Sequence, residues 1–299
     1  MKVVLLGPNG QVGTELRRAL APMGHVISLA RADGGDLDDP AGMEQRLRAL
    51  APDAVVNAAA YTAVDRAESE PALAERVNAD GPTRLAEVAA SLGARLVHYS
   101  TDYVFNGTGE RPWQESDEPA PLNVYGGTKW RGEQGVRASS ADALILRTQW
   151  VYARRGRNFI RTMLHLASER HALQVINDQR GAPTGAALIA DATAHALRAF
   201  AADPALSGTY HLAASGDTSW YEYARFVIER ARAWGYPTRV APSEVEAVAT
   251  EAFPMTAERP RNSRLDCRAL ERDFGLVMPD WRDEVARVVD EMVGRPGAE

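Results

Sequence analysis

The fold is decided by the stretch Lys2-Val3-Val4-Leu5-Leu6-Gly7-Pro8-Asn9-Gly10-Gln11-Val12-Gly13. Its apolar run predicts a strand that is buried on both faces, as in parallel sheets. Three glycines follow in the spacing Gly-x-x-Gly-x-x-Gly, and an amphipathic helix is expected from about Thr14 to Leu20. Between a strand and a helix, such glycines let the backbone turn tightly and approach a pyrophosphate at the helix N-terminus. The stretch therefore predicts a dinucleotide-binding loop.

The rest of the chain alternates short apolar runs with amphipathic segments, which predicts a parallel sheet covered by helices. Further strands are expected at 25–29, 54–56, 95–100 and 143–146, and helices at 40–50, 64–69, 71–80, 82–92, 185–201, 220–234 and 281–293. The expected fold class is α/β, a Rossmann-type doubly wound parallel sheet with a smaller, discontinuous substrate-binding lobe. We place the nucleotide-binding domain at residues 1–150 and about 184–229, and the lobe at about 151–183 and 230–299.

Composition narrows the class of protein. The chain has 299 residues, and 34 Lys and Arg against 40 Asp and Glu give a net charge of −6. This charge argues against non-specific nucleic-acid binding, which needs a basic surface. The single cysteine, Cys267, excludes an intrachain disulfide, and no cluster has zinc-ligand spacing. No apolar run is long enough for a membrane span or a signal peptide. The expectation is a cytoplasmic protein without a nucleic-acid or membrane partner.

Candidate cofactor contacts follow the expected strands at their carboxyl ends, where open α/β sheets bind ligands. After the second strand the chain has Arg31 where NAD-preferring sites usually carry an acid, which favours NADPH over NADH, although a surface arginine would give the same sequence. The small residues after the third strand would let a flat cofactor approach the backbone, and loop packing would explain them as well. The candidate cofactor residues are Gly7, Gly10, Gln11, Val12, Gly13, Arg31, Asp36, Leu37, Ala58, Ala59, Ala60, Tyr61, Thr62, Tyr99, Tyr125 and Lys129.

A candidate catalytic set combines Thr101, at the end of the fourth strand, with Tyr125 and Lys129. Residues spaced i, i+4 share one face of a helix. A nearby cation favours the phenolate, so we expect the pKa of Tyr125 to fall from about 10 toward the operating pH, where general acid catalysis works best. Alone, the pair would favour an exposed tyrosine and a solvated lysine on an amphipathic helix. The glycine loop and Thr101 at the same sheet edge favour carbonyl reduction, with Thr101 bonding the carbonyl oxygen and Tyr125 supplying the proton.

Several blocks resemble the extended short-chain dehydrogenase/reductase family, and within it the dTDP-4-dehydrorhamnose reductase group. They are Ser100-Thr101-Asp102-Tyr103-Val104-Phe105-Asn106-Gly107, Tyr125-Gly126-Gly127-Thr128-Lys129, and residues 147–152, 178–184 and 259–266. The resemblance implies NAD(P)H-dependent reduction of the 4-keto group of a nucleotide sugar, dTDP-4-dehydro-L-rhamnose, to dTDP-L-rhamnose, a precursor of cell-surface polysaccharide. The substrate contacts that we expect are Thr101, Asp102, Val104, Phe105, Trp150, Asn158, Arg259 and Arg261. Trp150 would also suit a core anchor, and either arginine a solvated surface.

Other interpretations stay open. A nucleotide-sugar epimerase or dehydratase of the same family is one, although the dehydratases carry an acid pair after the threonine and here Tyr103 follows Asp102. A non-catalytic regulatory subunit, resembling that of methionine adenosyltransferase, is another. Some relatives resemble metal-bridged homodimers. Glu15 and Asp191 are the candidates for such a metal, but Ala187 stands where a further acid would be expected, which argues against magnesium.

Overall fold

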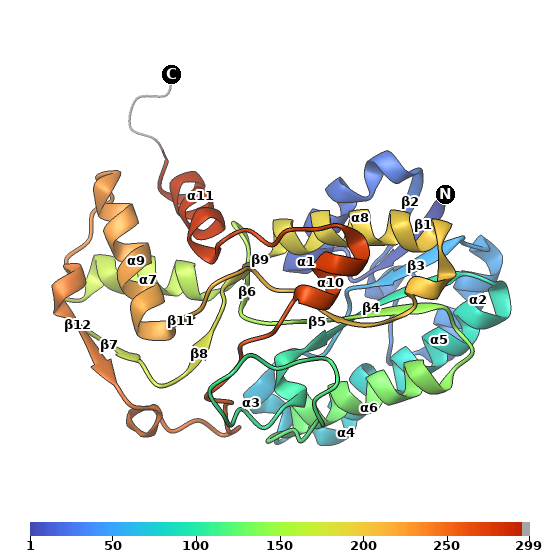
Figure 1. Ribbon diagram of the computed structural model, residues 1–299, viewed down its shortest axis with the longest axis horizontal. Coiled ribbons are helices and arrows are strands. Elements are labelled where there is room, and N and C mark those ends of the chain that lie inside the picture. Colours follow the sequence, from blue (N-terminus) through green and yellow to red (C-terminus); the bar gives the residue numbers. More distant parts are fainter. Residues whose placement is uncertain (295–299) are drawn as a thin grey trace.

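The computed structural model describes residues 1–294, and its centre is a six-stranded parallel sheet (Figure 1). The strand order is β10-β5-β4-β3-β1-β2. The strands are β1 (Lys2–Leu6), β2 (His25–Leu29), β3 (Ala54–Asn57), β4 (Arg95–Thr101), β5 (Ala143–Thr148) and β10 (Gly208–His211). The order of connection reverses between β1 and β3, and open α/β sheets bind ligands at the carboxyl end of such a point. The expected doubly wound parallel sheet is therefore present.

Strand register brings the candidate residues to one edge of the sheet. Leu6 of β1 pairs with Asn57 of β3, and Thr101 of β4 pairs with Thr148 of β5. The segments that follow these strands begin at Gly7, 58, 102 and 149, and they all leave the sheet at its carboxyl edge. The glycine loop, the alanine run and the region around Thr101 thus lie next to one another.

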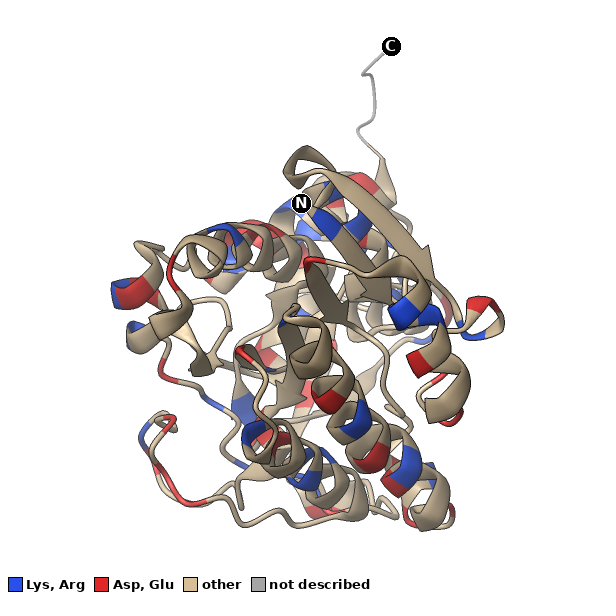
Figure 2. Cartoon of the chain, turned by 90° about the vertical axis from the view of Figure 1, so that its right-hand side faces the viewer, with Lys and Arg blue, Asp and Glu red and all other residues tan. Residues whose placement is uncertain are grey.

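Helices cover both faces of the sheet, as Figure 1 shows. On one face, α1 (Gln11–Ala19), α8 (Ala186–Ala202) and α10 (Arg268–Phe274) contribute Leu16, Ile189 and Leu270 to a common core with Val3 and Leu5. The other face is covered by α2 (Pro40–Leu50), α5 (Gly81–Leu92) and α6 (Val124–Ala138). Charged residues lie mainly on helices and loops and are sparse on the strands of the central sheet (Figure 2). No helix within residues 1–294 is long and apolar enough to cross a membrane.

A second apolar core lies beside the sheet, on the left in Figure 1. It is built by α7 (Phe159–Glu169), α9 (Trp220–Ala233), α11 (Trp281–Val293) and the parallel pair β7 (Leu173–Ile176) and β12 (Val245–Val248). The position of α9 differs from the expected domain boundary. We assigned its residues up to 229 to the domain of the sheet, whereas α9 packs in this second core. Helix α10 differs in the opposite direction, since Leu270 and Phe274 pack against the sheet.

The segment between β3 and β4 is less regular than we expected. Residues 64–92 form α3 (Val64–Ala67), α4 (Pro71–Glu75), a π-helical turn at Arg76–Asp80, and then α5. Pro82 lacks a backbone N–H, which disturbs the helical hydrogen-bond pattern where this turn meets α5. The short strands are β6 (Val151–Tyr152), β8 (Arg180–Gly181), β9 (Thr184–Gly185) and β11 (Thr218–Ser219); 3-10 turns lie at Ala21–Met23, Arg31–Asp33, Asp102–Val104, Pro204–Leu206, Pro242–Glu244 and Thr250–Ala252.

Candidate active site

Two cavities meet above the glycine loop. The larger, about 460 Å³, reaches from the loop to Trp220. Its lining is Gly10, Gln11, Val12, Ala58, Ala60, Thr62, Val64, Tyr99, Ser100, Thr101, Asp102, Tyr103, Tyr125, Lys129, Thr148, Gln149, Trp150, Val151 and Trp220. The smaller, about 270 Å³, lies beside it and contains Gly7, Arg31, Asp36, Leu37 and Ala59. The two share Gly10, Ala58 and Ala60, so together they form one elongated site that crosses the loop.

The residues of the loop fit a dinucleotide. Gly7 has a φ of +72°, and a Cβ there would lie 2.6 Å from the Ala59 nitrogen. A Cβ on Gly13 would lie 2.0 Å from the Gly7 oxygen. Within the described chain, no side chain caps the N-terminus of α1, and its first turn carries no acid. The close-packed backbone and the positive end of the helix dipole therefore suit a pyrophosphate.

The side chains expected around the adenosine lie at the smaller cavity. Arg31 is exposed, with its Nε 3.5 Å from Asp36 Oδ1, and Leu37 is buried in the cavity wall. An ion pair so exposed contributes little, so the guanidinium is available to an anionic ligand. Tyr61 lies apart from both cavities, since its hydroxyl donates to Glu70 Oε2 at 2.5 Å.

Thr101, Tyr125 and Lys129 lie together in the larger cavity, as expected. The helix that carries the last two begins at an Asn123 cap, whose side chain accepts a hydrogen bond from the Gly126 N–H at 2.8 Å. Lys129 Nζ donates to the Tyr99 carbonyl oxygen at 2.6 Å. Burial lowers the pKa of Lys129 to about 8, against the raising effect of Glu133.

The expected fall in the Tyr125 pKa is wrong. Burial raises the pKa of Tyr125 to about 12, the hydrogen bond with Thr101 opposes this rise, and the nearby Asp102 adds to it. Removing a phenolate from water costs more free energy than the hydrogen bond with Thr101 returns. The lysine has no part in this balance because its ammonium is directed at the Tyr99 carbonyl. At neutral pH Tyr125 is thus a protonated phenol that holds its proton.

Asp102 is a buried acid with one unused oxygen. Thr101 Oγ1 donates to its Oδ1 at 3.1 Å, and its Oδ2 has no hydrogen-bond partner within residues 1–294. Burial raises the pKa of Asp102 to about 7, and hydrogen bonds from Ser263 and Thr101 limit the rise. Buried polar atoms without a partner are rare in proteins, so Asp102 Oδ2 keeps its capacity to accept a hydrogen bond.

Trp150 forms one wall of the larger cavity together with Trp220, which the sequence reasoning missed. The rings stack with centroids 3.6 Å apart and planes at 15°. Trp150 holds a φ of +44°, which is unusual for a residue with a side chain and indicates local backbone strain. Gln149 and Val64 also line the cavity and were missed. Trp220 directly follows Ser219, the N-cap of α9, and this position at the start of a helix was the feature of the sequence that could have pointed to it.

The structure does not bring the remaining expected substrate residues to the cavity lining. Val104 and Phe105 are buried in a separate apolar cluster. Asn158 caps α7, and its Nδ2 donates to Gln11 Oε1 at 3.2 Å, which ties it to the glycine loop. Arg259 donates to Asp65 at 2.6 Å, and Arg261 pairs with Glu251 at 2.5 Å.

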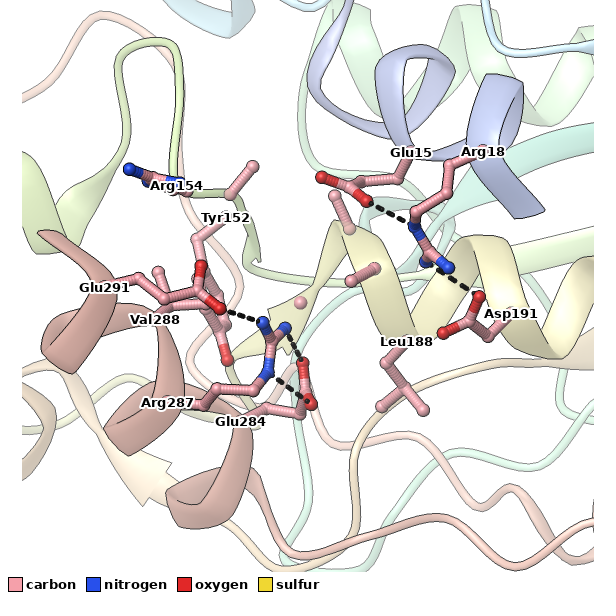
Figure 3. Close-up of a pocket in the computed structure, with 14 residues that line it drawn as sticks. Glu15, Arg18, Tyr152, Arg154, Leu188, Asp191, Glu284, Arg287, Val288 and Glu291 are labelled. Atoms are coloured by element: carbon pink, nitrogen blue, oxygen red, sulfur yellow. Dashed lines mark hydrogen bonds and ion pairs between the residues drawn. The ribbon is translucent and has the colours of Figure 1, made fainter.

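The two metal candidates, Glu15 and Asp191, already have a cationic partner. Arg18 donates to Glu15 at 3.2 Å and to Asp191 at 2.8 Å, and Figure 3 shows the guanidinium between the two carboxylates. Across the same cavity of about 310 Å³, Arg287 pairs with Glu284 and Glu291. Among residues 1–294, no group of three or more His, Cys, Asp or Glu is placed to hold a metal. These residues do not fit a magnesium ion, because arginines occupy the carboxylates that would bind it.

Structural neighbours of lower identity share only the fold. The UDP-glucose 4-epimerase of Thermus thermophilus, in complex with NAD, has a TM-score of 0.79 at 20% identity, covering 98% of this chain and 99% of that chain. A dTDP-glucose 4,6-dehydratase from Streptomyces venezuelae has a TM-score of 0.77 at 20% identity, covering 97% of this chain and 96% of that chain.

Closer relatives share a common name. The dTDP-4-dehydrorhamnose reductase of Escherichia coli (strain K12) is 50% identical over 295 residues, 98% of each chain. That of Burkholderia thailandensis is 46% identical over 299 residues, 99% of this chain and 100% of the relative. The crystal structure of dTDP-4-dehydrorhamnose reductase from Bacillus anthracis in complex with NADP is 34% identical with a TM-score of 0.87, covering 97% of this chain and 99% of that chain. The model of the RmlD substrate binding domain family matches residues 1–293. The resemblance found in the sequence is thereby confirmed, and the chain belongs to the RmlD substrate binding domain family.

Proposed function

We propose that the protein reduces the 4-keto group of dTDP-4-dehydro-L-rhamnose to give dTDP-L-rhamnose, with NADPH or NADH as cofactor. The observation that carries this proposal is the joint placement of Thr101, Tyr125 and Lys129 in a cavity continuous with the glycine loop. Relatives that are 46–50% identical over nearly their whole length bear the name of this reductase.

The cofactor would lie along the elongated site. Gly7, Gly10 and Gly13 would face its pyrophosphate, with further contacts from residues 11–12, 36–37, 58–60 and 62. Arg31 would meet a 2′-phosphate, which supports NADPH, since a guanidinium binds phosphate in a bidentate manner. When bound, the nicotinamide supplies the hydride for carbonyl reduction.

The chain's own residues would manage the charge and the proton. The Thr101 hydroxyl, which donates to Asp102 Oδ1 in the structure, would turn to the carbonyl oxygen beside Tyr125, and donors directed at a developing alkoxide stabilise charge that appears only in the transition state. Tyr125 holds its proton at neutral pH and gives it to that oxygen. Lys129 would bind the nicotinamide-ribose hydroxyls.

The sugar and diphosphate contacts complete the proposal. The unused Asp102 Oδ2 would bond a sugar hydroxyl, and Trp150 with Trp220 would form an aromatic wall for the sugar ring. Arg259 and Arg261 would reach the diphosphate by leaving their carboxylate partners, and Val104, Phe105 and Asn158 would act through backbone or neighbouring contacts.

We place the enzyme in the cytoplasm, in line with its single cysteine. We also propose that it forms a homodimer, and the mass measured by analytical sedimentation would test this.

The test is the oxidation of NADPH in the presence of the keto-sugar, followed by absorbance, for the wild type and Tyr125→Phe. We expect substrate-dependent oxidation by the wild type and a loss of about 10²–10⁴-fold in kcat for Tyr125→Phe, the usual contribution of a general acid. The phenyl ring keeps the buried shape, so NADPH affinity should change little. Full activity in Tyr125→Phe would refute the proton-donor role, and an inactive wild type that binds a partner enzyme would favour a regulatory subunit.

A further inference from the structure

A buried hydrogen-bonded chain runs beneath the cavity, from the loop after β3 to Lys129. It passes through Ala59, Asn57 and His98. Of its members, Asn57 and His98 have no role in the mechanism above. Asn57 and His98 face each other across neighbouring strands, and both side chains are almost completely buried. We propose that Asn57 and His98 are positioning residues for Lys129: Asn57 holds the neutral His98 ring with its proton on Nε2, and this proton is directed at the lysine nitrogen.

The orientation of the Asn57 amide follows from its neighbours. The Ala59 N–H donates to Asn57 Oδ1 at 3.0 Å, so the other end of the amide, Nδ2, faces His98 Nδ1 at 3.0 Å. Rotating the amide by 180° would set Nδ2 against the Ala59 N–H, two donors with no acceptor between them. A buried donor left without a partner costs about 1–3 kcal/mol. The amide therefore donates to the ring.

The state of the His98 ring follows from the amide. A nitrogen that accepts a hydrogen bond carries its lone pair, so Nδ1 is unprotonated. An imidazolium is excluded because both of its nitrogens are donors, and the pKa of His98 is lowered well below its usual value by burial and then by Lys129. The single ring proton is thus on Nε2.

This proton meets the nitrogen of Lys129. His98 Nε2 and Lys129 Nζ lie 3.4 Å apart, and Lys129 Nζ also donates to the Tyr99 carbonyl oxygen. An ammonium has three donors and no acceptor, whereas a neutral amine has a lone pair. The arrangement therefore favours the neutral amine, and His98 lowers the proton affinity of Lys129 through a specific contact in addition to burial.

Other charged groups around Lys129 act differently. Glu133, one turn further along α6, favours the ammonium, but two arginines share its carboxylate. Tyr125 on α6 is a neutral phenol, and Tyr99 from β4 presents its carbonyl. Asp102, which follows β4, lines the same cavity. His98 differs from these groups, because its tautomer determines whether its Nε2 favours the neutral amine or the ammonium of Lys129.

The chain also connects the two halves of the site. Ala59 lines the cofactor cavity, and its nitrogen lies where a Cβ on Gly7 would collide with it. The Ala59 N–H that orients Asn57 therefore lies directly against Gly7 of the glycine loop. The effects on turnover that we expect below rest on the proposed function, in which Lys129 acts as an ammonium.

The first test needs no variant and no substrate. The ¹⁵N resonances of the His98 ring distinguish a protonated from an unprotonated nitrogen, and His98→Gln identifies the signals. We expect the proton on Nε2 throughout the range from about pH 6 to about pH 9, which includes the region where an unperturbed histidine titrates. A proton on Nδ1, or a ring that becomes imidazolium in this range, would overturn the proposal even if the protein reduces the keto-sugar.

The second test reverses the tautomer with Asn57→Asp. Both carboxylate oxygens accept, so His98 must carry its proton on Nδ1 and offer a lone pair to Lys129. We expect the Lys129 Cε titration, followed by ¹³C resonance, to move from near pH 8 to a midpoint higher by about one unit or more. The alkaline fall in kcat/KM should move with it, whereas a merely structural role would lower activity equally at all pH values.

The added charge needs its own control, which is Asn57→Asp combined with His98→Gln. A glutamine has no ring tautomer, so the upward shift should shrink markedly in this double variant. An equal shift in both backgrounds would show that charge alone acts on Lys129 and would overturn the role of His98. Because the titration is read by resonance, a failure of the proposed reductase activity would not imitate either result.

Discussion

Two glycines of the dinucleotide loop differ in what they protect, and alanine at each should separate stability from cofactor binding. A Cβ on Gly13 would lie 2.0 Å from the Gly7 oxygen and 2.8 Å from the Gly7 carbonyl carbon. A Cβ on Gly10 meets only the Gly7 oxygen, at 3.6 Å, which is ordinary contact. Neither residue has a positive φ, so space rather than backbone conformation decides the outcome.

The magnitude for Gly13→Ala follows from two opposing effects. Alanine inside a helix is favoured over glycine by about 1 kcal/mol. The overlap with the Gly7 backbone cannot be relieved by rotating a side chain, and overpacking of this kind costs about 1–3 kcal/mol or more. The loop must shift by more than an ordinary contact allows, so strain wins, and we expect a net loss of about 1–2 kcal/mol together with weaker NADPH binding.

Gly10→Ala is the matched control. The added Cβ makes only an ordinary contact with the protein, so the free energy of unfolding should stay within about 0.5 kcal/mol of the wild type. Gly10 lines both cavities, and a methyl group there would hold the pyrophosphate away from the loop, so NADPH affinity should fall by about tenfold or more. Urea unfolding and fluorescence titration with NADPH measure the two quantities. A Gly13→Ala protein of wild-type stability, or a Gly10→Ala protein of wild-type affinity, would refute this account of the loop.

Three further perturbations test other parts of the structure. Glu133→Gln should destabilise the protein by about 3–5 kcal/mol in urea unfolding, because it leaves the buried Arg147 without its charge partner. The folded-state pKa of Asp102 lies at about 7, above the 3.8 of a free carboxyl. The protonated Asp102 therefore contributes fully to stability below pH 3.8, and this contribution is lost as the pH rises through about 7. Asp102→Asn should remove this decline, and an unchanged pH dependence of unfolding would contradict the assignment. Arg31→Ala should reduce the ratio of kcat/KM for NADPH to that for NADH, and an unchanged ratio would end the argument for this residue.

The central strands were predictable, with one informative exception. β1, β3, β4 and β5 are short apolar runs, and burial on both faces makes such runs visible in the sequence. β10 has the sequence Gly-Thr-Tyr-His and was missed. It is a strand because it pairs in parallel with β5 at the edge of the sheet, a long-range contact that local composition does not reveal.

The sequence predicted that Thr101, Tyr125 and Lys129 would share a cavity, but it did not predict which other side chains line that cavity or how burial changes the pKa of Tyr125. Tyr125 and Lys129 reach the expected cavity, and the pKa of Tyr125 moves opposite to our expectation because burial raises it more than the hydrogen bond with Thr101 lowers it. The spacing of two residues in a helix says which face they share. It does not say how much water remains around them or where the ammonium finds its acceptor.

By itself, the sequence determined the sheet and the phosphate loop, because apolar runs and closely spaced glycines act through local backbone geometry. Tertiary structure alone decided the pairing of Arg18 with Asp191, and the stacking of Trp220 on Trp150. It also decided the buried contact of Asn57 with His98, two residues far apart in the chain. Each of these contacts depends on which side chains the fold brings together and removes from water, and this follows from packing of the whole chain.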